Sequence, residues 1–200
     1  MATLLAPRIA PAPKPHVASG ASPSVLAAIH RPAINFAVWE RTLAPALLAD
    51  LAALDLCCAA DVRFTAALPD LSDCLAAAMA AAGWAGPALT ADVLALARSF
   101  ASVMACPAVE VRLEVVDDDA CRKFHADYVP ARLVTTYLGP GTDWLPDGAD
   151  STTPPRRLAA GAVALFKGRS WPTDNPIIHR SPPIAGTGQR RVVLVLNPAG

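Results

Sequence analysis

Three residues in the second half of the chain have the types and spacing of a metal site. His125 and Asp127 are two positions apart, and alternate residues of an extended chain point the same way, so one imidazole and one carboxylate can reach a common point. His179 follows at the end of a short apolar segment. Two imidazoles and one carboxylate leave open coordination positions, as in non-haem Fe(II) centres, and the same set also binds Zn(II). We therefore expect His125, Asp127 and His179 to hold one divalent metal ion.

These ligands lie in a part of the chain that has the pattern of β-structure. Val109, Val111, Leu113 and Val115 alternate with charged residues, which predicts a strand with one buried face. No helix of useful length fits between the later strands, so a parallel sheet is disfavoured and an antiparallel barrel or jelly roll is expected. Those later strands are expected at residues 132–138, 161–167, 177–180 and 191–197.

The region before Pro107 has a helical period instead. We expect helices around residues 43–51, from Leu71 to Ala82 with Asp70 and Ser72 as candidate caps, and after Thr90 as N-cap. The predicted fold class is α+β, with N-terminal helices packed on a C-terminal antiparallel domain in one cooperative unit. Its parts are a disordered Pro/Ala-rich tail (1–24), a helical annex (25–106) and a β-rich metal-binding domain (107–200).

Composition excludes several classes of function. The chain has 17 basic and 17 acidic residues and no net charge, so it has no global field to attract nucleic acid or an anionic membrane. No apolar run approaches the roughly 18 residues of a membrane span. The five cysteines form an odd set without a CxxC pair, which favours buried, reduced thiols in a reducing compartment. We expect a soluble cytoplasmic protein, and no residue set fits a hydrolytic triad.

The order of motifs after His125 resembles the double-stranded β-helix of the Fe(II)/2-oxoglutarate-dependent oxygenases. A strand and turn ending in Lys167-Gly168 precede His179, and Arg190-Arg191 then open an apolar run. The resemblance implies Fe(II) and 2-oxoglutarate as cofactors, with one of the two arginines binding the far carboxylate of the co-substrate. Only one of these adjacent residues can face inward, and we expect Arg190, whose distance from His179 is closer to that of the family. The other possibility is that both are solvated charges at a strand end.

Two further side chains have expected roles near this site. Tyr137 could donate its hydroxyl to the co-substrate, or it could be a packed core tyrosine. Arg132, on the opposite strand face from Tyr137, is expected to pair with Asp127 or Asp143.

Four longer blocks are similar to a bacterial family of unknown function, DUF1826. They are residues 35–41 (NFAVWER), 131–145 (ARLVTTYLGPGTDWL), 165–171 (LFKGRSW) and 179–182 (HRSP). Members of this family tend to occur among zinc-responsive genes, so the resemblance also allows a non-enzymatic metal-binding protein of zinc homeostasis that uses Zn(II) alone. Only five strands are evident where a full double-stranded β-helix has eight, and further strands are suspected near Phe36 and Val62. The substrate, a small molecule or a peptide, is left open.

Overall fold

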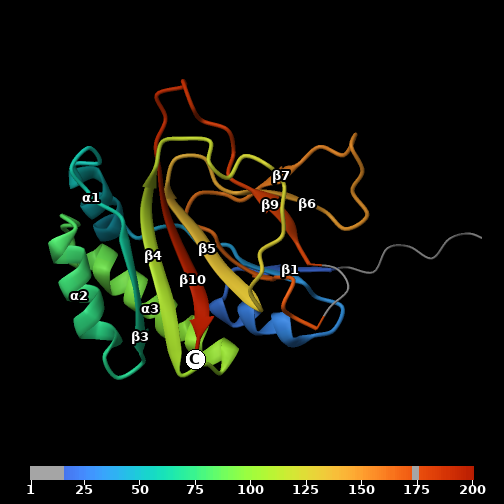
Figure 1. The fold of residues 1–200 in the computed structure, drawn as a ribbon, viewed down its shortest axis with the longest axis horizontal. Helices are drawn as coiled ribbons and strands as arrows, with labels where there is room; N and C mark the ends of the chain where they lie inside the picture. The colour runs from blue at the N-terminus through green and yellow to red at the C-terminus, as the bar shows by residue number, and fades with distance from the viewer. Residues whose placement is uncertain (1–15, 173–175) are drawn as a thin grey trace, which may run out of the picture.

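The computed structural model describes residues 16–172 and 176–200, and it contains a large sheet, a small sheet and a layer of helices (Figure 1). The strands are β1 (Val17–Gly20), β2 (Phe36–Trp39), β3 (Val62–Ala67), β4 (Ala108–Val116), β5 (Ala131–Leu138), β6 (Asp143–Leu145), β7 (Arg156–Arg157), β8 (Val163–Lys167), β9 (Ile178–Arg180) and β10 (Arg191–Ala199). The main sheet has the order β1-β2-β8-β5-β10-β4-β3, and the second sheet has the order β7-β6-β9. The pairing of β1 with β2 is parallel, and the other strand pairs are antiparallel.

From β4 onward the chain alternates between the two sheets. β4 lies in the main sheet, and His125 then forms an isolated antiparallel bridge with His179 of β9. β5 returns to the main sheet, β6 and β7 lie in the second sheet, and β8, β9 and β10 alternate again. The bridge therefore takes the place of a strand in the second sheet, which gives the winding of a double-stranded β-helix. The five strands expected from the sequence are present, and β6 and β7 complete the small sheet.

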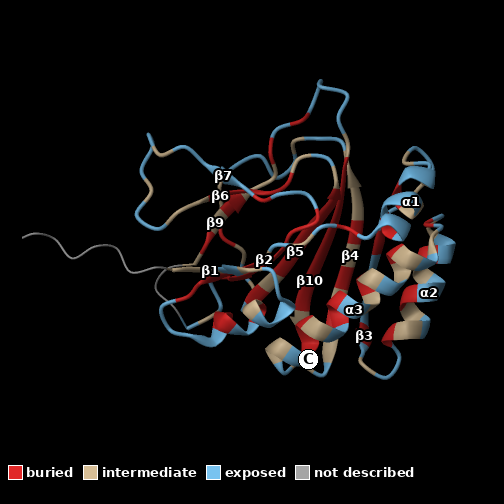
Figure 2. Ribbon diagram, turned by 180° about the vertical axis from the view of Figure 1, so that it is seen from behind, coloured by how far each residue is buried: buried red, intermediate tan, exposed pale blue. Residues whose placement is uncertain are grey.

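Alternate residues of the central strands face two different cores. Val192, Leu194 and Leu196 of β10 belong to the core beneath the helices, whereas Val193 and Val195 belong to the core between the two sheets. Both faces of β10 are therefore covered, and its first seven residues are buried (Figure 2). This explains why β10 has an almost continuous apolar sequence while β4 alternates with charged residues.

Four helical segments precede β4: the 3-10 helix η1 (Pro23–His30) and the α-helices α1 (Pro45–Ala53), α2 (Leu71–Ala81) and α3 (Pro87–Met104). The expectation that Thr90 is the N-cap of the third helix is wrong, because α3 begins at Pro87 and the Thr90 hydroxyl donates to the Gly86 carbonyl. The first amides of α3, those of Ala88 and Leu89, are bound instead by the Asp50 carboxylate of α1. A carboxylate from one helix thus caps the N-terminus of another.

The α-helices and one face of the main sheet share a large hydrophobic core. Buried residues of all three α-helices and of β3, β4 and β10 belong to one cluster, and α3 contacts both β4 and β10. The 18 residues of α3 reach the length and mean hydropathy, 1.2, of a membrane-crossing helix. However, Asp92 and Arg98 lie within it, and one of its faces is buried in the core. These features are those of the core helix of a globular domain.

The segment before β4 differs from a simple helical annex. β2 and β3 belong to it and join the main sheet, which confirms the strands suspected near Phe36 and Val62. The disordered tail expected over residues 1–24 is wrong for its last part, because β1 and the start of η1 lie there. Residues 1–15 fall outside the described part of the chain. Pairing of β1 with β2 gives this short segment backbone partners that its composition does not reveal.

The cysteines also differ from expectation. Cys57, Cys58 and Cys121 are exposed, and Cys74 and Cys106 are intermediate; all five are free. The prediction of burial is therefore wrong for Cys57, Cys58 and Cys121, and the prediction of reduced thiols stays a prediction. Cys57 and Cys58 lie in the turn after α1 rather than in a helix.

Candidate metal centre

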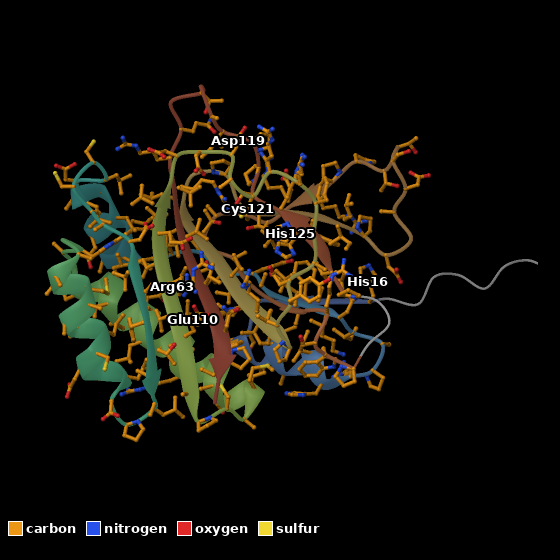
Figure 3. All side chains as sticks on the ribbon, viewed as in Figure 1. His16, Arg63, Glu110, Asp119, Cys121 and His125 are labelled. Atoms are coloured by element: carbon orange, nitrogen blue, oxygen red, sulfur yellow. The ribbon has the colours of Figure 1, made fainter. Side chains whose placement is uncertain are left out.

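Two of the three expected metal ligands are held together by a backbone bridge. The amide of His125 donates to the carbonyl of His179 at 3.0 Å, and the amide of His179 donates to the carbonyl of His125 at 2.9 Å. Directly opposed residues of an antiparallel pair place their side chains side by side, and the two ring centroids are 4.7 Å apart. The bridge thus brings together two histidines that are far apart in the sequence (His125 is labelled in Figure 3).

The carboxylate of Asp127 lies between these rings. Its Oδ2 atom is 3.2 Å from Nε2 of His179, and its Oδ1 atom is 3.6 Å from Nε2 of His125. One ligand atom from each of the three residues lies within 4.8 Å of the other two. The structure therefore brings together His125, Asp127 and His179, as the spacing of the sequence predicts.

The free atoms of this cluster fit a bound cation. Nδ1 of His125 is 2.8 Å from the carbonyl of Lys123, so Nδ1–H can donate there and leave Nε2 with a lone pair that faces Asp127. Within the described residues, Oδ2 of Asp127 is buried without a hydrogen-bond partner and faces Nε2 of His179. Nδ1 of His179 also lacks a partner there, but it lies on the side of the ring away from Asp127. Unsatisfied buried polar atoms are costly. A divalent metal ion matches two imidazoles and a carboxylate that converge in this way.

The carboxylate is kept ionised by its neighbours. Burial alone would raise the pKa of Asp127, but its contact with His179 and the charges of Arg132 and His125 outweigh burial and hold the pKa below its ordinary value. Nη1 of Arg132 is 2.7 Å from Oδ1 of Asp127, which confirms the expected pairing of this arginine. Asp143 pairs with Arg157 and Arg180 instead.

The backbone of the ligand-bearing segment is fixed by the turn after β8. The amide of Arg169 donates to the carbonyl of Asp127 at 2.8 Å, and the amide of Gly168 donates to the carbonyl of Pro130 at 2.9 Å. A Cβ atom on Gly168 would lie 2.2 Å from the carbonyl oxygen of Val129 and 2.8 Å from that of Asp127. Only glycine permits this close approach. The Lys167-Gly168 turn therefore positions Asp127, a candidate metal ligand.

Of the two adjacent arginines, the structure buries Arg191. Its exposed fraction is 1%, and it lines a cavity of about 100 Å³ together with His125 and His179. Arg190 faces the opposite way, where its guanidinium contacts Sγ of Cys57 and lies near Asp117. The preference for Arg190 is therefore wrong. The alternation of side chains along β10 explains this orientation. Arg191 lies two and four positions before Val193 and Val195, so its side chain points the same way, into the space between the sheets.

The guanidinium of Arg191 is held by neutral groups. Within the described residues its hydrogen-bond acceptors are the Pro140 carbonyl (2.7 Å) and the hydroxyls of Ser181 (2.8 Å), Thr136 (3.3 Å) and Thr142 (3.4 Å). Burial lowers its pKa to about 10, and the group remains a cation at neutral pH. These acceptors are not among the residues expected from the sequence. If Arg191 faces the cavity, the alternation of side chains along β5 predicts that Thr136 faces it too.

Tyr137 lies outside this cavity. Its side chain has an exposed fraction of 2% and belongs to the core beneath the helices, where its hydroxyl donates to Oδ2 of Asp92 at 2.7 Å. The same carboxylate binds two nitrogens of Arg41. A role for Tyr137 in binding a co-substrate beside Arg191 is therefore wrong, and the alternative of a packed core tyrosine is correct.

A larger hollow of about 370 Å³ lies elsewhere, between the edge of β2 and β7. Its lining includes Glu40, Trp144 and Arg156, but none of the three metal-ligand candidates. Trp144 is buried against Phe36, with ring centroids 4.8 Å apart, so it fills the inside of the barrel. Convergent polar groups mark the smaller cavity as the candidate site.

Two solved structures with a similar fold come from plants. The dioxygenase for auxin oxidation from rice is 14% identical, with a TM-score of 0.56, and the match covers 92% of this chain and 82% of that one. The 2-oxoglutarate complex of the dioxygenase for auxin oxidation 1 from Arabidopsis thaliana is 11% identical, with a TM-score of 0.50, and the match covers 92% of each chain. At such identities the likeness shows the fold alone, which this chain shares with both dioxygenases.

Comparison by sequence gives the family. No curated protein matches the chain. The family model described as protein of unknown function (DUF1826) matches residues 20–197, which include the three metal-ligand candidates and both arginines. The chain belongs to the DUF1826 family.

Proposed function

We propose that this protein is an Fe(II)- and 2-oxoglutarate-dependent oxygenase. The observation that carries the proposal is Arg191, a buried cation with neutral partners, in the same cavity as His125 and His179. The metal-ligand candidates are His125, Asp127 and His179. When bound, the iron would supply the activation of O2 and the oxidation of a C–H bond, while 2-oxoglutarate is converted to succinate and CO2.

The burial of the Arg191 guanidinium favours the binding of an anion beside it. Removing a guanidinium from water costs on the order of several kcal/mol, and neutral hydrogen bonds recover only part of this cost. A dicarboxylic 2-oxo acid that reaches the metal with one end carries a second carboxylate at its other end. The planar fork of an arginine can bind that carboxylate through two hydrogen bonds. Ser181, Thr136 and Thr142 hold the fork in place through their hydroxyls.

The similar solved structures support this assignment at the level of fold. Both are dioxygenases for auxin oxidation, and the protein from Arabidopsis thaliana was solved with 2-oxoglutarate. The likeness offers no guide to the substrate of this chain. A small molecule or a peptide with a C–H bond near the metal fits the proposal.

The alternative of a zinc-binding protein without catalysis uses the same three ligands. It gives no role to the buried cation of Arg191, since a metal carrier needs no anion at that place. The oxygenase is therefore the better account of the whole cavity.

The test is the release of succinate from 2-oxoglutarate by the purified protein with Fe(II), ascorbate and O2. Slow turnover without a primary substrate is expected for the wild type. Arg191→Gln should reduce it at least about 100-fold, because two charge-assisted hydrogen bonds are lost. Arg190→Gln is the matched control, since this neighbouring arginine faces away from the cavity. Equal rates for the two variants would contradict the proposal.

A further inference from the structure

The two oxygens of Asp127 have different surroundings. Oδ1 is bound by Nη1 of Arg132 at 2.7 Å. Oδ2 faces Nε2 of His179 and lacks a hydrogen-bond partner within the described residues. The side chains of Asp127 and Arg132 have exposed fractions of 10% and 17%, so water competes weakly for this contact. One oxygen of the carboxylate is thus occupied and the other is available.

Arg132 is itself held by a row of polar side chains across the main sheet. Its Nε atom donates to Oδ1 of Asn197 at 2.9 Å, and Nδ2 of Asn197 donates to Oε2 of Glu110 at 2.7 Å. Oε1 of Glu110 accepts from Arg63 at 3.0 Å. The row therefore crosses β5, β10, β4 and β3, and each of its links joins a donor to an acceptor. Figure 3 shows its outer end, where Arg63 and Glu110 lie side by side on neighbouring strands.

Strand register makes this row rigid. Asn197 is paired with Glu110 across β10 and β4, and Leu196 is paired with Leu133 across β10 and β5, so Asn197 lies opposite Arg132. The amide of Asn197 is oriented by the charge at each end, since its oxygen faces a guanidinium and its nitrogen faces a carboxylate. The bond from Asn197 is the first cause that lowers the pKa of Glu110, which keeps that carboxylate charged.

We propose that Arg132 is a positioning residue that occupies Oδ1 of Asp127, so that Oδ2 alone is offered to the metal. This inference rests on the proposed metal site. A free carboxylate can bind a metal through one oxygen or two. Binding through two oxygens would take a coordination position that a co-substrate or O2 requires. Arg132, fixed from behind by Asn197, prevents this and holds the carboxylate plane in one orientation.

A different role for Arg132 makes the opposite prediction. If Arg132 only competes with the metal for the carboxylate of Asp127, its removal would raise the affinity of the site for metal. If Arg132 positions the ligand, removal would lower metal affinity. The sign of the change therefore separates the two roles.

The experiment is a titration of the full-length apoprotein with Co(II) and with Zn(II), followed by calorimetry and by the visible absorption of bound Co(II). Arg132→Met should weaken both metals by about 10- to 100-fold, the usual cost of losing an outer partner of a ligand, and should change the shape of the Co(II) spectrum. Arg132→Lys should recover part of the affinity, because its ammonium can still reach Oδ1. Asn197→Leu, which leaves the ion pair in place, should give a loss of about threefold to tenfold.

Arg112→Met is the matched control. Arg112 lines the same cavity, but its ion-pair partner is Glu114, so affinity should stay within about twofold and the Co(II) spectrum should be unchanged. Unchanged or tighter binding by Arg132→Met would overturn the inference. If Arg132→Met fails to fold, wild-type affinity and spectrum in both Arg132→Lys and Asn197→Leu would overturn it.

These outcomes are separate from those of the proposed function. A wild-type protein that binds metal through Arg132-dependent geometry but forms no succinate would refute the oxygenase and leave this inference standing. A wild type that binds neither metal would refute both.

Discussion

Two buried arginines on opposite faces of the main sheet have different kinds of hydrogen-bond partners. On the helix-covered face, Arg41 is bound by both oxygens of Asp92, and the same carboxylate accepts from Tyr137. On the barrel face, Arg191 is at least as buried, yet its partners are neutral. The opposite charges of Arg41 and Asp92 neutralise each other and stabilise the fold. Arg191 has no carboxylate among its hydrogen-bond partners, unlike Arg41 and unlike Arg132 on its own face. We infer that its charge is available to a ligand, at a cost in stability.

The largest effect on stability is expected on the helix-covered face. Asp92→Ala would leave the guanidinium of Arg41 and the hydroxyl of Tyr137 buried without their acceptor, so the free energy of unfolding should fall by about 3 kcal/mol. Urea denaturation measures this change. Asp73→Ala is the control, since Asp73 is an exposed residue of α2, and it should cost less than about 1 kcal/mol. A cost for Asp92→Ala as small as the control would show that the ion pair contributes little.

The next effect is expected at the turn that supports the metal ligand. Gly168→Ala places a Cβ atom against two carbonyl oxygens of the segment that carries Asp127, so a loss of about 1 to 3 kcal/mol in unfolding free energy is expected. Zn(II) affinity should fall as well, because Asp127 must shift. Gly20→Ala is the control, since its Cβ would meet Val25 at an ordinary 3.7 Å. Wild-type Zn(II) affinity in Gly168→Ala would contradict the positioning role of this turn.

A smaller effect is expected at the start of α3. Asp50→Ala removes the carboxylate that accepts from the amides of Ala88 and Leu89, and the loss of such a cap costs about 1 kcal/mol. Asp50→Asn keeps an accepting oxygen and should recover most of this stability. Zn(II) affinity should be unchanged in both variants, because α3 lies on the face opposite the cavity. A change in metal affinity would show that the two faces are coupled.

The smallest effect on stability is expected for the most buried charge. Arg191→Met replaces an arginine whose hydrogen-bond acceptors are neutral, and which feels Asp143 only through its charge, by an apolar side chain. The unfolding free energy should therefore change by less than about 1 kcal/mol in either direction. Thermal denaturation at fixed pH measures the change. A loss comparable to that of Asp92→Ala would show that Arg191 is mainly structural, and the contrast between the two faces would disappear.

Much of the barrel could be predicted from local pattern. The alternation of β4 and the apolar run of β10 identify strands, and the spacing of His125 and Asp127 indicates two candidate ligands, because these signals arise within one segment. β6 and β7 have three and two residues, too few to display a period, and they exist only through their pairing with neighbours. β1 was missed for the same reason. The bridge that joins His179 to His125 is likewise a tertiary feature.

The sequence predicts which segments form strands better than it predicts which side chains of a strand face the barrel. Arg190 was favoured from its offset to His179, although the parity of β10 with Val193 and Val195 points to Arg191. Tyr137 was considered for the site, but which face of β5 meets the barrel depends on how β5 pairs with β10 and β8. Arg132 is expected to pair with Asp127 or Asp143, and it pairs with Asp127. Its parity is opposite to that of Tyr137, but it is Arg132 that faces the barrel and Tyr137 that faces the helices.

The most direct test of the central claim is a calorimetric titration of 2-oxoglutarate, without O2, into the metal-loaded protein and into the apoprotein. Tight binding is expected only with metal, and Arg191→Gln should weaken it by at least about 100-fold while its affinity for the metal stays within about threefold of the wild type. Equal binding of 2-oxoglutarate by Arg191→Gln and the wild type, or no binding by the metal-loaded wild type, would contradict the account.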